Sequence, residues 1–166
     1  MSSKEQLKAA LEAKDVQLET QKREREERLE VERQRAMAHT EQYVKAVGKL
    51  NEQIAKWVEG LDFQITAQNR HLSDGPENYD AIGLILVRRS QFLSFIPKGK
   101  STGEYLGSIT LQPKEDRQRG SLSLQLASIN SDGSGSWFLV ASVNGDSNEF
   151  PFDDKRFYDL LKTTFA

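Results

Sequence analysis

Seven basic residues between positions 88 and 119 are the side chains best suited to bind a ligand. Only Glu104, Glu115 and Asp116 oppose them in this interval, which leaves a local surplus of positive charge. Clustered lysines and arginines bind phosphate groups, either on a nucleic acid or on a lipid headgroup. If the loops 97–104 and 113–120 lie at one end of a sheet, the set forms an anion-binding surface; ordinary solubilising loop charge is the alternative. The seven are Arg88, Arg89, Lys98, Lys100, Lys114, Arg117 and Arg119.

The tripeptide Gly99-Lys100-Ser101 matches the end of a phosphate-binding P-loop. The complete motif needs a glycine five residues before Gly99, where the chain has Ser94, and a helix after it. The residues that follow are typical of a strand, so the backbone amides that cradle a phosphate would be missing. We therefore interpret 97–104 as a hairpin loop.

Patterns for acid–base, nucleophilic and metal chemistry are weak in this sequence. The chain has no cysteine, and neither His39 nor His71 has a ligand-like neighbour four residues away. No G-x-S-x-G segment occurs, and the pair Asp153-Asp154 is explained by helix capping. The sequence predicts a non-enzymatic protein with no catalytic residues, no cofactor and no metal.

Short strands would have to position the basic loops. Leu122, Leu124 and Leu126 alternate with polar residues, which is the period of a half-buried strand. The apolar run 81–87 indicates a central strand, and Asn144-Gly145 is a strong hairpin signal. About seven strands are predicted after residue 62, and their short connections imply antiparallel pairing.

The last element is predicted to be an amphipathic helix over 153–165, capped by Asp153 or Asp154. The predicted fold class is therefore α+β: a long N-terminal coiled-coil helix, then an antiparallel, roughly seven-stranded curved sheet or partial barrel with a C-terminal helix. An open antiparallel sheet with the helices packed on one face is the alternative. The predicted domains are 1–61, with the coiled coil strongest at 43–61, and 62–166.

Residues 1–61 predict one long charged helix with a heptad seam in its second half. Its β-branched a positions and a central leucine at d favour a parallel two-stranded coiled coil. The same face can instead pack on the chain's own β-rich domain, and we expect both: the last turns on the sheet, the earlier turns on another chain. The predicted dimer seam is Tyr43, Val47, Leu50, Ile54 and Trp57, with Leu61 next in the frame.

The first half of this helix has a thinner apolar pattern. Leu7, Leu11 and Leu18 follow a heptad frame that is offset by one residue from the later seam. Between the two frames, 21–35 is dense in charge, and opposite charges four residues apart support a helix there. We interpret 21–35 as a solvated helical spacer, because its acids and bases alternate along the chain.

The totals narrow the classes of function. The chain carries 23 Lys and Arg against 25 Asp and Glu, which argues against strong nonspecific binding to nucleic acid or anionic membranes. No run of 18 apolar residues and no secretory signal is seen, so we expect a cytoplasmic protein. The predicted function is protein–protein interaction or assembly: a homodimer through the N-terminal helix that presents a recognition domain to an unidentified partner protein. The alternative is a phosphate-binding module that uses the basic loops.

Overall fold

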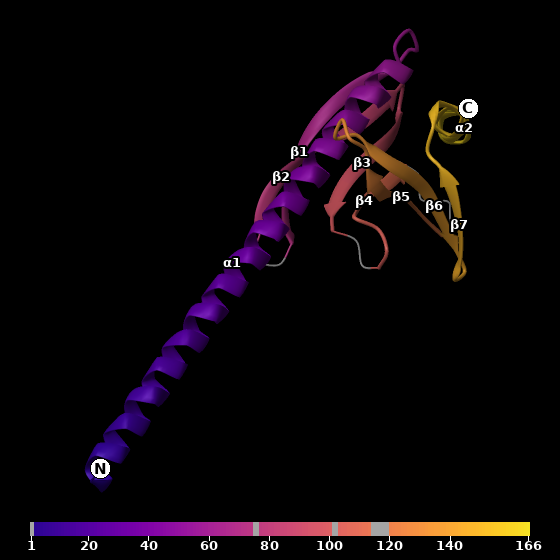
Figure 1. The fold of residues 1–166 in the computed structure, drawn as a ribbon. Coiled ribbons are helices and arrows are strands. Elements are labelled where there is room, and N and C mark those ends of the chain that lie inside the picture. The colour runs from indigo at the N-terminus through magenta and orange to yellow at the C-terminus, as the bar shows by residue number, and fades with distance from the viewer. Residues whose placement is uncertain (1, 75–76, 101–102, 114–119) are drawn as a thin grey trace. The chain divides into compact units, whose positions relative to one another are not determined.

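Figure 1 shows the computed structural model of the chain, which describes residues 2–74, 77–100, 103–113 and 120–166. It has a long N-terminal helix, a seven-stranded antiparallel open sheet and a C-terminal helix, so the α+β prediction is confirmed. The elements are α1 (Ser3–Trp57), β1 (Gln64–Asp74), β2 (Glu77–Arg88), β3 (Gln91–Gly99), β4 (Gly107–Pro113), β5 (Gly120–Ile129), β6 (Gly135–Val143), β7 (Asp146–Pro151) and α2 (Asp154–Phe165).

The chain divides into two compact units, Met1–Ala38 and His39–Ala166. This division lies well before the boundary at residue 61 that the sequence suggested. The reason is that the last third of α1 buries its apolar side chains in the same core as the sheet. Residues 39–61 therefore belong to the folded unit rather than to the N-terminal helical segment.

The sheet is a simple meander, because each strand pairs with the next one in sequence. All six pairings are antiparallel. The turn between β6 and β7 is Asn144-Gly145, and both residues have positive φ angles, 52° and 85°. This conformation suits a two-residue hairpin turn. The predicted hairpin at this position is confirmed.

One face of the sheet is apolar and is covered by the two helices. The inward leucines of β5, Leu124 and Leu126, are fully buried, as the alternation in the sequence predicts. Helix α1 covers this core with residues from Tyr43 to Trp57, and α2 adds Phe157, which has no exposed surface. Burial of each large apolar side chain stabilises the fold by about 1.5–3 kcal/mol.

Helix α2 begins as its sequence predicts. The Asp153 side chain accepts a hydrogen bond from the Arg156 amide at 2.9 Å, so Asp153 is the cap rather than Asp154. The Phe157 ring lies 5.1 Å from the Trp57 ring, centre to centre. The Tyr158 hydroxyl donates to the Trp57 carbonyl oxygen at 3.1 Å. These contacts join α2 to the end of α1.

The first unit is a helical segment, residues 3–38, whose side chains are exposed except for the partly buried Thr20 and Ala36. A capping box starts it: the Glu5 amide donates to Ser2 Oγ, and the Ser2 amide donates to Glu5 Oε2. Within the spacer, Arg33 and Glu30 form an ion pair at 2.8 Å. Neither helix has a stretch, within the residues described, that is long and apolar enough to span a membrane.

Candidate functional site

The expected dimer seam is part of this chain's own core. Tyr43, Val47, Leu50 and Ile54 are buried against the sheet, and Trp57 is partly buried against α2. The prediction left open whether this face packs on the β domain or on a second chain; within the chain it packs on the sheet. An open sheet with one apolar face needs a covering layer, and the adjoining helix supplies it. A dimer through α1 would have to use other residues.

Tyr43 also joins α1 to the polar end of β3 and the start of β4. Its hydroxyl donates to the Ser108 carbonyl oxygen at 2.6 Å and accepts from the Gly99 amide at 3.1 Å. Its ring packs so closely on Gly107 that a Cβ atom there would lie 2.3 Å from Tyr43 Cδ2. Burial raises the pKa of Tyr43 to about 12, although the hydrogen bond from Gly99 acts in the opposite direction.

The cluster around Tyr43 extends to the far end of the β1–β2 hairpin. The Tyr79 hydroxyl donates to the Asp74 carboxylate, and the same carboxylate accepts from the Lys100 amide at 3.0 Å. The pKa of Tyr79 is raised, first by burial and then by this hydrogen bond. Asp74 therefore already serves as an acceptor within the fold, and this cluster holds the chain around Gly99 in place.

The two histidines, His39 and His71, form hydrogen bonds with different parts of the chain. His39 Nε2 donates to the Leu106 carbonyl oxygen at 2.7 Å, and His71 Nδ1 lies 3.0 Å from Asp80 Oδ1. The hydrogen bond from His71 lowers the pKa of Asp80. Across the part of the chain that the structure describes, no three acidic or histidine side chains gather as metal ligands would.

The predicted anion-binding set does not come together. Arg88 ends β2 and Arg89 lies in the turn before β3, while Lys98 and Lys100 lie at the other end of β3, about 25 Å away at the rise of an extended strand. Lys114, Arg117 and Arg119 fall outside the described residues. The prediction of one continuous basic surface is therefore wrong for the four residues that are described.

The error comes from the assumption that the loops 97–104 and 113–120 lie at the same end of the sheet. Pro113 pairs with Leu93 near the start of β3, whereas Ser108 pairs with Gly99 at its end. The loops 97–104 and 113–120 thus leave and join the sheet at opposite ends of β4. In a meander each hairpin reverses the chain, so consecutive connections alternate between the two ends of the sheet.

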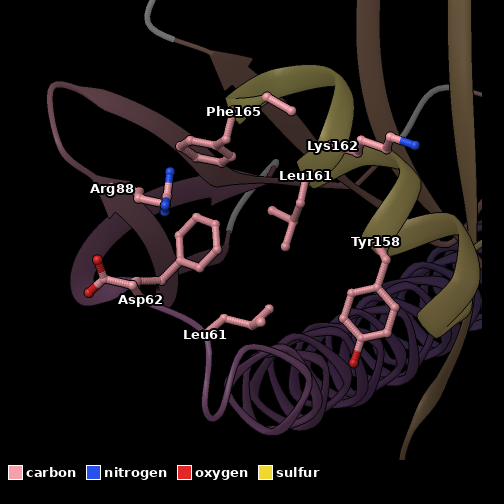
Figure 2. Close-up of a pocket in the computed structure, with 9 residues that line it drawn as sticks. Leu61, Asp62, Arg88, Tyr158, Leu161, Lys162 and Phe165 are labelled. Carbon is pink, nitrogen blue, oxygen red and sulfur yellow. The ribbon is translucent and has the colours of Figure 1, made fainter.

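A shallow pocket of about 360 Å³ lies where α2 meets the start of β1 and the end of β2 (Figure 2). Figure 2 shows Arg88 and Lys162 on opposite sides of an apolar floor that includes Leu161, with the Lys162 ammonium directed away from the floor. Neither cation forms an ion pair with any described residue. Asp62 lies on the Arg88 side and reduces the positive charge there. The lining residues are Leu61, Asp62, Phe63, Arg88, Tyr158, Leu161, Lys162, Phe165 and Ala166.

Of the described residues of the predicted basic set, Arg88 alone lines this pocket, and sequence reasoning missed the other lining residues. A signal was present, because Tyr158 and Lys162 are four residues apart and so lie on one face of α2. The sequence did not show which residues lie opposite this face of α2. A pocket with an apolar floor and two cations that form no ion pair with a described residue can hold a small anion that carries an apolar group.

Comparisons with known proteins add no relative: no family model and no curated protein match this sequence, and no solved structure matches this fold.

Proposed function

We propose that this chain is a non-enzymatic interaction protein in which the helical segment 3–38 pairs with a helix of another polypeptide. One observation carries the proposal: every side chain of this segment except Thr20 and Ala36 is exposed. An isolated helix gains little stability from propensity alone, and helices in proteins are stabilised mainly by packing of an apolar face. The unit 39–166 is then the folded domain that the complex presents, in a cytoplasmic adaptor or assembly protein.

Because the predicted dimer seam is buried within the chain, the homodimer predicted from the sequence cannot use these residues. Tyr43, Val47, Leu50 and Ile54 are occupied by the chain's own core. A coiled coil, with a second copy or with another protein, is therefore limited in this proposal to residues 3–38. Four leucines in this segment are more than half exposed, Leu7, Leu11, Leu18 and Leu29, and they supply the apolar contacts.

We expect the double substitution Leu11→Glu and Leu18→Glu to abolish association. Each change places a charge where a partner helix would cover a leucine. The tagged full chain would be used to capture proteins from a native lysate, with a second copy of the chain counted among the possible partners. Light scattering at tens of micromolar would measure the mass of the purified complex.

The matched control for this experiment is Val16→Glu with Val31→Glu. Both valines are exposed, at 67% and 48%, and they lie away from the leucines around the helix. This control is expected to retain the partner. The proposal fails if the leucine variant and the wild type retain the same proteins in the same amounts.

A second candidate function follows from the pocket between Arg88 and Lys162. We propose that it binds a small anion with an apolar group, such as an alkyl phosphate, as a narrower form of the predicted phosphate-binding module. The support is the apolar floor between two cations that have no ion-pair partner among the described residues. Phosphate oxygens form charge-assisted hydrogen bonds with arginine and lysine.

Hexyl phosphate is the probe for this second candidate, with calorimetry on the full chain. Arg88→Gln is expected to weaken binding about tenfold, because it removes a charge-assisted hydrogen bond. Arg89→Gln is the control, since Arg89 is exposed and is not among the lining residues. Equal binding by the two variants, or equal binding of inorganic phosphate and hexyl phosphate, would contradict this function.

A further inference from the structure

The four exposed leucines of the helical segment 3–38 lie on one line along the helix. Leu7, Leu11, Leu18 and Leu29 are 60%, 54%, 53% and 58% exposed. Their spacings are close to whole turns of an α-helix, so they fall within about 40° of one another around its axis. We call these four residues the leucine line. In a heptad frame, which assumes 3.5 residues per turn, Leu29 is offset by one position from the other three leucines. In a straight α-helix with 3.6 residues per turn, all four leucines lie on the same side of the axis.

Charge is distributed unequally around this helical segment. Residues 3–38 carry nine basic and nine acidic side chains, which alternate along the sequence. Around the axis, at 100° per residue, the two signs separate. Seven of the nine basic residues lie on the half that contains the leucine line, all except Arg23 and Arg35. Six of the nine acidic residues lie on the other half, all except Asp15, Glu26 and Glu32. The leucine half therefore has a surplus of about four positive charges, and the segment as a whole is neutral.

The basic residues also lie within the leucine line itself. Arg25 lies between Leu18 and Leu29 and is within about 20° of the middle of the line, and Lys14 and Lys22 lie about 40° to either side. A helix that packs on the leucine line must therefore meet cations at its centre as well as at its edges. Such a helix is most stable where it places carboxylates opposite them.

A second copy of this chain is a poor occupant of the leucine line. In a symmetric dimer the same surface is used by both chains, so one basic half would face the other. In a parallel pair, Lys14, Lys22 and Arg25 would each lie near the same residue of the copy. Like charges at such positions destabilise a helix pair.

A lipid surface fits less well than a helix. Helices that lie in a membrane interface use a broad apolar face, commonly with aromatic residues. The leucine line is only about 40° wide, whereas the apolar face of a surface-packed helix is typically wider than about 100°. The segment 3–38 contains no aromatic residue. A narrow apolar line flanked by charges is instead the pattern of a helix–helix seam.

We propose that the leucine line binds an acidic amphipathic helix of a different protein, with aspartates or glutamates beside its apolar stripe. This inference rests on the proposed function, which requires only that residues 3–38 pair with a helix of any charge. It names the chemistry of the partner: apolar residues cover the leucines, and carboxylates lie opposite Lys14, Lys22 and Arg25.

The test uses the full chain and two synthetic helical peptides of about 30 residues. Both peptides carry leucines at the spacing of the leucine line; one is flanked by glutamates and the other by lysines. Binding would be measured by fluorescence anisotropy of the labelled peptide at low and high salt. The wild-type chain is expected to bind the glutamate peptide, with an affinity that falls as salt rises, and to bind the lysine peptide at least tenfold more weakly.

Two double variants with the same change in net charge complete the experiment. Lys14→Gln with Arg25→Gln removes two cations from the leucine half, and Arg23→Gln with Arg35→Gln removes two from the other half. The first pair is expected to weaken binding of the glutamate peptide about five- to tenfold, as loss of two exposed charge contacts implies. The second pair is expected to change it less than twofold.

Several results would overturn the inference. These are equal affinity for the two peptides, equal losses in the two double variants, a stable homodimer of the wild-type chain in sedimentation, or retention on phosphatidylserine vesicles without peptide binding. They are separable from a failure of the proposed function. If Leu11→Glu with Leu18→Glu abolishes association while both charge variants bind normally, helix pairing stands and the acidic partner does not.

Discussion

Replacing Ile54 with alanine is expected to lower the free energy of unfolding by about 2–5 kcal/mol. Ile54 has no exposed surface, and it lies in the core that α1 shares with the sheet. The substitution removes methyl groups from a packed interior and leaves a cavity that its neighbours fill only in part. Because the contacts are within one chain, the loss should be the same at every protein concentration.

Chemical denaturation of the full chain at two concentrations, a hundredfold apart, would measure this effect. The control is Lys56→Ala, an exposed position two residues later on the same helix, which is expected to change stability by less than about 0.5 kcal/mol. If Tyr43 to Trp57 formed a seam between two chains, the midpoint of unfolding would rise with protein concentration. That result would restore the homodimer seam predicted from the heptad pattern.

A second large effect is expected at alkaline pH. The pKa of Tyr43 is raised to about 12 in the folded chain from an ordinary value of 10. A group with a raised folded pKa contributes stability that is complete below pH 10 and is lost as pH rises through 12. Ionisation of Tyr43 in its buried site is therefore expected to remove about 3 kcal/mol of stability over this interval.

Tyr43→Phe tests this expectation. At pH 7 the variant is expected to be about 1–3 kcal/mol less stable than the wild type, because the Ser108 carbonyl and the Gly99 amide both lose their partner. Between pH 10 and 12 this difference should shrink, since the variant has no hydroxyl to ionise at this position. The tyrosinate absorbance near 295 nm, compared between the two proteins, would report the titration directly. A difference in stability that stays constant from pH 8 to 12 would contradict the buried, neutral hydroxyl.

The local elements of this fold follow from short stretches of sequence. The alternation of Leu122, Leu124 and Leu126 predicts β5, and Asn144-Gly145 predicts the β6–β7 turn. The pair Asp153-Asp154 predicts the start of α2, and the structure shows that Asp153 is the cap. Each of these signals acts within a few residues, because side-chain alternation, positive φ angles and helix caps are properties of the backbone nearby. The antiparallel order then follows from the short connections.

The candidate site was less predictable, because it depends on which ends of which elements meet. Arg88 and Lys162 are 74 residues apart in the sequence, and the pocket between them forms where α2 reaches the end of β2. The grouping of Lys98 and Lys100 with Arg88 fails for the same reason. In a sheet built of hairpins, two loops that are close in sequence can lie at opposite ends of the sheet.

The sequence by itself determined that the face from Tyr43 to Trp57 is buried, because its apolar residues recur at helical spacing. Only the tertiary structure decided what covers that face. An apolar stripe requires removal from water, and a sheet of the same chain satisfies this requirement as well as a second helix does. The local concentration of the attached sheet favours contact within the chain. The exposed leucines of α1 that are left for another polypeptide are therefore those of the leucine line.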